Sequence, residues 1–231
     1  MTTTTNPSTT KARIIVAGGQ KGGTGKSCTT ISLAAEALAR GLRVLLCDAD
    51  PQGTTRTWHG IAQQNGHPAP HVVLLGATMH KPGELPAMAR DYDLVVVDLP
   101  PRHADVQRSA LLVADQIVLP CGGSSSDAWA LIASLRLVDE ARKHRPKLDA
   151  AILLNRIRGS TALGRGAREV LSSTGWRVLA SELHDRIAYQ EAVGEGLGPA
   201  QFAPRSEAAS EVRALVDELL PKTKGKGNRP S

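Results

Sequence analysis

KGGTGKS, residues 21–27, lies between a strand-like run and a helical pattern in this 231-residue chain. The strand-like run is RIIVAG at residues 13–18, and apolar residues at helical spacing begin after Lys26. Glycines at positions 22, 23 and 25 let backbone N–H groups turn inward around phosphate oxygens, and the following helix adds positive potential at its N-terminus. A strand, a glycine loop and a helix in this order predict a phosphate-binding loop.

Individual residues of the loop suit Mg-ATP. Lys26 would supply the charge on the β- and γ-phosphates, and the Ser27 hydroxyl would ligate Mg²⁺. The strict pattern GxxxxGK[ST] needs glycine where this chain has Gln20, so the match is to a variant form with a second lysine, Lys21. We expect the nucleotide to contact Gly22, Gly23, Thr24, Gly25, Lys26, Ser27 and Cys28.

Strand-like and helical segments alternate along the chain. Strand-like runs fall at residues 13–18, 43–48, 71–75, 93–98, 116–120, 150–155 and 176–180. Helical patterns fall at residues 26–40, 105–114, 126–144, 162–174 and 206–220. Several strand runs are unbroken Val, Ile and Leu, as in strands covered on both faces. The alternation predicts an α/β P-loop NTPase fold, doubly wound, with a mostly parallel sheet and helices on both faces.

A single ATPase domain at residues 13–220 is expected between two tails. Residues 1–12 are Thr-rich with almost no apolar content, and residues 221–231 carry four basic residues and no acid. Neither segment can bury enough apolar surface to offset the entropy lost on ordering. We therefore predict a disordered tail at 1–12 and a basic disordered tail at 221–231.

Composition excludes several classes of protein. The three cysteines are far apart in sequence, which argues against a disulfide framework or a structural zinc site. No apolar run reaches the length of a membrane span, so a cytoplasmic protein with no membrane partner is expected. Residues 142–186 hold ten Lys and Arg against four Asp and Glu. Such a basic region is typical of polyanion binders, although a solvated surface explains it equally well.

Three motifs together resemble the ParA/MinD ATPases. They are KGGTGKS, then DADPQG at residues 48–53, then YDLVVVDLPP at residues 92–101, in the order and spacing of that family. The resemblance covers residues 13–220 and is greatest to small ParA partition ATPases that lack an N-terminal helix-turn-helix. Three residues depart from those usual in the family: Cys28, Ser32 and Leu99. We still expect the protein to bind nucleotide, but these departures leave its hydrolysis rate open.

The resemblance implies roles for further residues. Lys21 corresponds to a lysine that reaches the partner's ATP across a dimer, and Asp50 to the residue that orients the attacking water. Asp48 would support the metal region, and Asp98 would hold a Mg²⁺-bound water. Asn155 resembles the asparagine that reads the adenine edge.

The resemblance also implies a function. The chain would form a homodimer with ATP, bind DNA without sequence preference, and release it when a ParB-like adaptor stimulates slow hydrolysis. The protein would then be nucleoid-associated and would position a plasmid, a chromosome or a protein assembly. Candidate DNA-binding residues are Arg156, Arg158, Arg165, Arg168 and Arg186.

Two other functions stay open from the sequence. A P-loop small-molecule kinase would use the same loop, although such an enzyme has no need of Lys21. A MinD-like membrane-associated positioning ATPase would need an amphipathic anchor, and the tail after residue 220 has no apolar or aromatic residue to provide one.

Overall fold

A seven-stranded parallel sheet forms the centre of the part of the chain that the structure describes. The computed structural model describes residues 11–158 and 162–220, apart from the side chains of Ser125 and residues 162–165. The strands lie in the order β3-β2-β4-β1-β5-β6-β7. Their bounds are β1 (Arg13–Ala17), β2 (Val44–Asp48), β3 (His71–Leu74), β4 (Leu94–Asp98), β5 (Gln116–Cys121), β6 (Asp149–Ile157) and β7 (Val178–His184).

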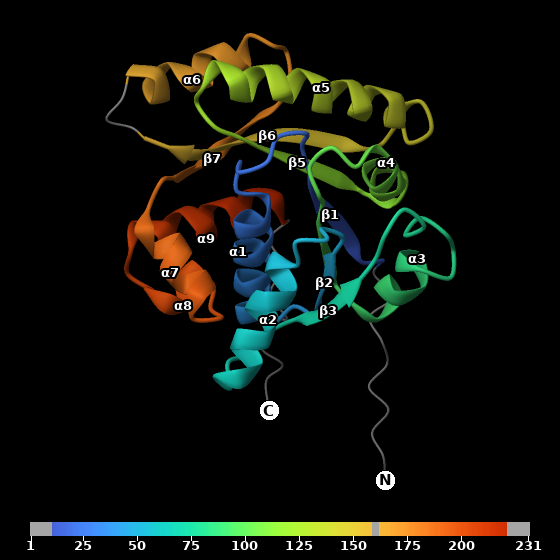
Figure 1. The fold of residues 1–231 in the computed structure, drawn as a ribbon, viewed down its shortest axis with the longest axis vertical. Helices are drawn as coiled ribbons and strands as arrows, with labels where there is room; N and C mark the ends of the chain where they lie inside the picture. The colour runs from blue at the N-terminus through green and yellow to red at the C-terminus, as the bar shows by residue number, and fades with distance from the viewer. Residues whose placement is uncertain (1–10, 159–161, 221–231) are drawn as a thin grey trace, which may run out of the picture.

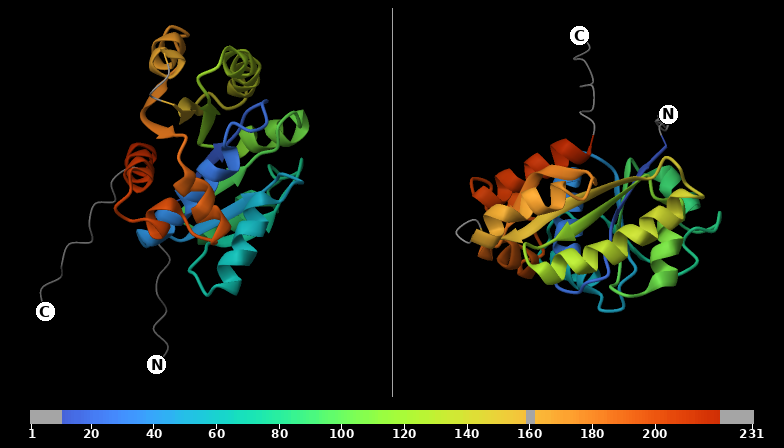
Figure 2. Two further views of the ribbon diagram at one scale, coloured as in Figure 1. Left: turned by 60° about the vertical axis from the view of Figure 1, so that its left-hand side comes forward. Right: turned by 90° about the horizontal axis from the view of Figure 1, so that it is seen from above.

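Helices cover both faces of this sheet (Figure 1). One face carries α1 (Lys26–Ala39), α2 (Thr54–Gln64), α7 (Ile187–Gly194), α8 (Pro199–Phe202) and α9 (Glu207–Leu219). The other carries α3 (Leu85–Met88), α4 (Ala104–Val113), α5 (Ser125–Arg142) and α6 (Ala162–Ser172), and the short 3₁₀ helix η1 (Ala89–Asp91) leads into β4. Figure 2 shows α5 and α6 side by side over the β5–β7 half of the sheet. The predicted doubly wound α/β fold is confirmed.

The central strands are apolar throughout because both of their faces are covered. In β4, Val95 and Val97 join one core, and Leu94 and Val96 join the other. All four residues are at most 1% exposed. This two-sided burial explains why β4 is an unbroken apolar run rather than an alternating one.

The strand order places the glycine loop where the chain changes direction across the sheet. β1 lies between β4 and β5; after β1 the chain builds β2–β4 on one side and then β5–β7 on the other. In open α/β sheets, ligands bind in the crevice outside the carboxyl ends of strands at such a switch point. Asp48 and Asp98, which end β2 and β4, are register partners at this edge.

Several elements differ from their predicted bounds. The helices α2, α3, α7 and α8 were not predicted; in α2 only Thr55, Trp58 and Ala62 are buried, too few apolar residues to give a helical pattern. β7 begins and ends later than expected, because its polar residues obscure the alternation at this edge of the sheet. Ala12, predicted to belong to the N-terminal tail, is buried in the core, whereas residues 1–10 and 221–231 lie outside the described part.

Among the helices described, none combines the length and apolar character needed to cross a membrane.

Candidate nucleotide-binding site

The glycine loop has a geometry that other residues would not tolerate. Gly25 precedes α1 with a φ of 87°, in the left-handed region, and a Cβ there would collide with the side chain of Asn155. Cβ atoms at Gly22 and Gly23 would meet nothing within 4 Å, so open space lies beside the loop. No side chain caps α1 within the described residues, which leaves its first N–H groups available to an anion.

Lys26 lies inside this loop. Its side chain is buried, and its Nζ donates a hydrogen bond to the Lys21 carbonyl at 2.8 Å. Burial lowers the pKa of Lys26, while the nearby carboxylates of Asp98 and Asp50 offset part of that effect. A buried ammonium beside the glycine loop is suited to bind phosphate oxygens, and the role of Lys26 at the β- and γ-phosphates stays a prediction.

Asp98 is a fully buried carboxylate. Its two oxygens accept no hydrogen bond of ordinary geometry within the described residues, although the nearby Ser27 hydroxyl favours the charged form and offsets part of the effect of burial on the pKa. Burial raises the pKa of Asp98 to about 7, and the neighbouring Asp48 and Asp50 contribute to the rise. A buried anionic group with free oxygens fits a bound cation or its water.

Mg²⁺ would suit the residues gathered here. The described residues hold no group of three or more His, Cys, Asp and Glu that could form an all-protein metal site. Mg²⁺ usually keeps several waters and uses one or two protein ligands together with phosphates. Ser27 and Asp98 are sufficient for such a site.

Asp48 and Asp50 differ in how their carboxylates are used. Asp48 accepts from the Asp50 N–H at 3.0 Å, from the Arg56 N–H at 3.2 Å and from Arg56 Nε at 3.3 Å. Asp50 is half-buried and accepts from the Gln52 N–H at 2.9 Å. Asp48 therefore holds the loop that carries Asp50, which agrees with a supporting role better than with direct metal ligation.

Lys21 points away from Lys26 and toward α5. Its Nζ donates to Asp127 Oδ1 at 2.7 Å and to Ser126 Oγ at 2.8 Å, and the side chain is 36% exposed. Asp127 is itself held by Ser124 in a capping box at the start of α5. Burial alone would raise the pKa of Asp127, but the hydrogen bonds from Lys21 and Ser124 lower it overall.

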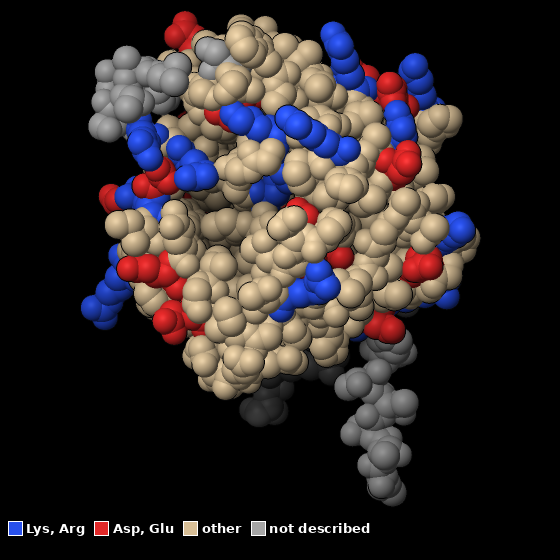
Figure 3. All heavy atoms as spheres, viewed as in Figure 1, with Lys and Arg blue, Asp and Glu red and all other residues tan. Residues whose placement is uncertain are grey.

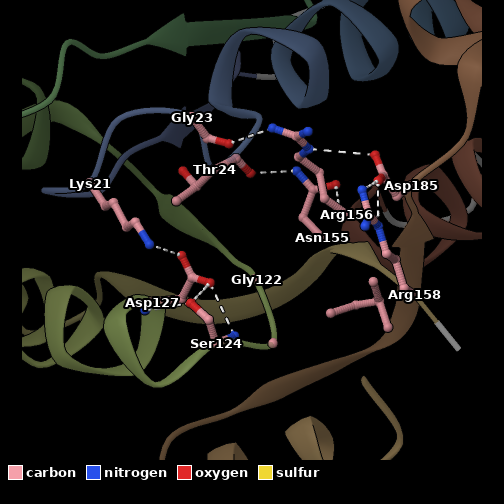
Figure 4. A pocket seen from close by; sticks show the side chains of 12 residues that line it. Lys21, Gly23, Thr24, Gly122, Ser124, Asp127, Asn155, Arg156, Arg158 and Asp185 are labelled. Carbon is pink, nitrogen blue, oxygen red and sulfur yellow. Dashed lines mark hydrogen bonds and ion pairs between the residues drawn. The ribbon is translucent and has the colours of Figure 1, made fainter. Parts of the chain in front are cut away.

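A cavity of about 580 Å³ opens beside the glycine loop (Figure 4). Lys21, Ser124 and Asp127 line one side, and Arg156 and Asp185 line the other. The cavity is large enough for a nucleotide, which ligand pockets of about 300–1,000 Å³ accommodate.

Asn155 lies beneath the glycine loop and forms part of the lining of this cavity. Its Nδ2 donates to the Thr24 carbonyl at 2.7 Å, and its Oδ1 accepts from the Arg156 N–H at 2.9 Å. The side chain is 5% exposed. Asn155 therefore fixes the loop, with its Nδ2 and its Oδ1 both engaged in hydrogen bonds; its reading of the adenine edge stays a prediction.

The arginines predicted to bind DNA lie in several environments. Arg156 donates to the Gly23 carbonyl at 3.0 Å, and both Arg156 and Arg158 pair with Asp185. These two residues thus belong to the cavity. Arg168 pairs with Glu182 at 2.7 Å, Arg186 pairs with Glu207 and Glu211, and the side chain of Arg165 lies outside the described residues.

The surface around the cavity carries charges of both signs. Figure 3 shows Lys and Arg side chains around a hollow on this face, with Asp and Glu side chains between them. The charge around the hollow is therefore mixed rather than uniformly basic.

Thr24 and Cys28 also lie at the loop. The Thr24 hydroxyl is buried and has no hydrogen-bond partner within the described part. Cys28 is half-buried, and burial raises the pKa of its thiol to about 11, so it is a neutral group. Thr24 lines the cavity, whereas Cys28 packs against the core on the α1 face of the sheet, so contact of either residue with a nucleotide stays a prediction.

The sequence did not identify Ser124, Asp127 and Asp185 as site residues. Ser124 and Asp127 belong to the stretch GGSSSD, residues 122–127, which directly follows β5. A glycine–serine loop at the carboxyl end of a parallel strand is a signal that could have indicated them. Asp185 had no such signal.

Comparison with known proteins agrees with this site. The model of the CobQ/CobB/MinD/ParA nucleotide binding domain matches residues 14–200. Maintenance of carboxysome distribution protein A from Halothiobacillus neapolitanus is 31% identical over 213 residues, covering 91% of this chain and 98% of that protein. Chromosome-partitioning ATPase Soj from Thermus thermophilus is 31% identical over 239 residues, covering 91% and 96%.

Solved structures show the same fold. The ATP complex of a single-substitution variant of Cyanothece McdA matches with a TM-score of 0.74 and 16% identity, covering 90% of this chain and 96% of that one. The septum site-determining protein MinD from Pyrococcus horikoshii, complexed with Mg-ADP, matches with a TM-score of 0.68 and 19% identity, covering 90% and 96%.

The buried Asp98 predicts a pH dependence of stability. A raised pKa means that Asp98 is stabilising when protonated below about pH 4, and that this stability is lost as the pH rises through about 7. We expect Asp98→Asn to stabilise the nucleotide-free protein at pH 8, by on the order of a few kcal/mol at most, and to have little effect near pH 4. Denaturant unfolding of both proteins across this range measures the difference; a difference that does not change with pH would contradict the prediction.

The collision at Gly25 predicts an unusually costly substitution. Gly25→Ala adds a steric clash with Asn155 to the strain of a positive φ, so we expect a loss of about 2 kcal/mol or more in the free energy of unfolding. Gly66→Ala is the matched control, because Gly66 has a φ of 70° and nothing within 4 Å of an added Cβ. Equal losses in both variants, measured by denaturant unfolding, would show that the contact with Asn155 is unimportant.

Proposed function

The chain belongs to the CobQ/CobB/MinD/ParA nucleotide-binding domain family, and we propose that it is a ParA-type ATPase that positions a large cargo. In this proposal it binds Mg-ATP, forms a nucleotide-dependent homodimer, binds DNA without sequence preference and hydrolyses ATP slowly. A ParB-like adaptor on the cargo would stimulate hydrolysis and release the DNA. The protein would then be cytoplasmic and nucleoid-associated.

One observation carries the proposal: the two lysines of KGGTGKS are separated. Lys26 is 6% exposed and lies inside the loop, whereas the Lys21 ammonium lies on α5, bonded to Ser126 and Asp127. A monomeric kinase needs the charge of Lys26 but has no use for a lysine turned away from its phosphate site. A lysine held at the rim of the cavity can instead act on a nucleotide bound by a second copy.

The residues of the site suggest how hydrolysis proceeds. The loop N–H groups and Lys26 would hold the phosphates. Ser27 would ligate Mg²⁺ and Asp98 would hold a water on it, and the ion would supply positive charge to the phosphates. Asp50, on the loop held by Asp48, orients the attacking water. Lys21 completes the site of the partner subunit.

The relatives suggest the class of cargo. Those at 31% identity are named for carboxysome distribution and for chromosome partitioning. Both names describe the placement of a large body in the cell. A chromosome, plasmid or protein assembly is therefore the proposed cargo.

Non-specific DNA binding would depend on contacts between basic side chains and phosphates. Arg156, Arg158, Arg165, Arg168 and Arg186 remain the proposed residues. Arg168 and Arg186 pair with carboxylates, so they would exchange these partners for DNA phosphates. A dimer that joins two such surfaces would bind more tightly than a monomer through avidity.

Lys21→Ala tests the separation of the lysines, with Lys26→Ala as its control. We expect Lys21→Ala to bind Mg-ATP with near-normal affinity and to fail to dimerise, because its charge acts on the partner's nucleotide. DNA affinity should fall with dimerisation, whereas Lys26→Ala should lose ATP binding itself. Calorimetry, light scattering and salt-dependent DNA binding measure the three properties.

Two results would contradict this proposal. One is ATP-dependent dimerisation and DNA binding that persist undiminished in Lys21→Ala. The other is a wild-type protein that binds no DNA at low salt and phosphorylates a small acceptor, which would favour a kinase.

Asp50→Ala tests the hydrolytic step. We expect ATP binding to be retained and the dimer to persist, while turnover falls by about 10²-fold, because positioning of the attacking water is lost. Single-turnover hydrolysis measures the rate. A turnover within about twofold of wild type would assign this role to another residue.

A further inference from the structure

Two amide side chains connect the glycine loop to the loop that follows Asp98. Gln107, in α4, is 4% exposed. Its Nε2 donates to the Pro100 carbonyl at 3.0 Å, and its Oε1 accepts from Gln20 Nε2 at 3.2 Å. Pro100 is two residues after Asp98, and Gln20 directly precedes Lys21. The two amides therefore join the segments that carry the predicted metal-side carboxylate and the rim lysine.

The chemistry of the end groups fixes the orientation of both amides. A backbone carbonyl only accepts hydrogen bonds, so Gln107 must turn its NH₂ group toward Pro100. Its carbonyl oxygen then faces Gln20, which must donate. Because Gln107 is buried, breaking either of its hydrogen bonds would leave a polar atom without a partner. That cost keeps both bonds formed. We call the chain from the Pro100 carbonyl through Gln107 to Gln20 the amide relay.

Gln20 is also held by a second contact, through its backbone. Its backbone N–H donates to Ser134 Oγ at 3.0 Å, and Ser134 lies on α5. Asp127, which binds Lys21, lies seven residues earlier on the same helix, or about two helical turns. The segment that contains Gln20 and Lys21 is thus attached to α5 at two points, and the side chain of Gln20 attaches it to α4 as well.

We propose that Gln107 is a positioning residue that, through Gln20, couples the loop after Asp98 to the placement of Lys21. The inference rests on the proposed function, in which Lys21 acts on a partner's nucleotide. When Asp98 and its loop adjust to Mg-ATP, the Pro100 carbonyl carries Gln107 and then Gln20 with it. Lys21 is thereby aligned for the partner only when its own subunit is loaded.

The relay also accounts for a departure in the sequence. Gln20 occupies the position where the strict phosphate-loop pattern has glycine. A glycine there has no side chain that could reach Gln107. The side chain at this position thus supplies a contact that the strict pattern does not allow.

A double-mutant cycle tests the coupling. Gln107→Met keeps a similar length and removes both polar atoms, and Gln20→Ala removes the other end of the bond. We expect each change to raise the ATP concentration for half-maximal dimerisation by about tenfold, the loss typical of one buried hydrogen bond, with nucleotide affinity within about threefold of wild type. The double variant should be no worse than either single variant.

Ser109→Ala is the matched control. Ser109 lies on the same helix and is 2% exposed; its hydroxyl accepts from the His80 N–H and shares a hydrogen bond with the His80 ring instead of with the loop. It should dimerise like wild type. Equal losses in Ser109→Ala, or fully additive losses in the double variant, would overturn the proposal. Gln20→Ala keeps the test valid if Gln107→Met does not fold, because Gln20 is only half-buried.

Hydrogen exchange separates failure of the relay from failure of the proposed function. In the wild type, Mg-ATP should change amide exchange in both segments 99–107 and 19–21, whereas in Gln107→Met only the first should respond. A wild type that binds ATP without dimerising would refute the proposed function, and the exchange result would still decide the relay. A response of segment 19–21 that is unchanged in Gln107→Met would overturn the relay.

Discussion

The nucleotide site depends on one amide side chain beneath the glycine loop. Asn155 Nδ2 donates to the Thr24 carbonyl, across 131 positions of sequence, and the amide lies where a Cβ of residue 25 would be. Gly25 is therefore required, and its positive φ turns the chain directly into α1. This turn places Lys26 inside the loop and near Asp98. β6, which carries Asn155, is thus as much a part of the site as β1.

The two aspartates at the carboxyl edge show how local sequence sets the role of identical side chains. Asp48 is followed by residues whose N–H groups turn back to its carboxylate. Asp98 is followed by Leu99, whose N–H donates to the Ala17 carbonyl, and then by two prolines, which have no N–H. No main-chain donor from these residues is left for Asp98, so its oxygens stay unpaired within the described part of the chain, and its pKa is raised to about 7 by burial. The prolines therefore keep this carboxylate available for a cation.

The sequence predicts the parts of this protein that rest on local patterns. The glycine loop, the parallel strands and the carboxyl-edge aspartates follow from apolar runs and turn residues a few positions apart. Contacts between distant residues could not be predicted in this way: Gln20 meets Gln107 and Lys21 meets Asp127 across 87 and 106 positions. α2 was missed for a different reason, because a single buried tryptophan, Trp58, is its main anchor and gives no periodic signal.

Ion pairs between arginines and carboxylates within the basic region, residues 142–186, reduce the number of arginines that are free to bind an anion. Of its four acids, Asp149, Glu182 and Asp185 all pair with arginines of the same region. An arginine that already has a carboxylate partner gains little from a phosphate, since it exchanges one anion for another. Lys143 and Lys147, beside the end of α5, are exposed and have no ion pair within the described residues. If the protein binds a polyanion as proposed, the attraction would therefore come from the charge of the whole surface, more than from any one arginine.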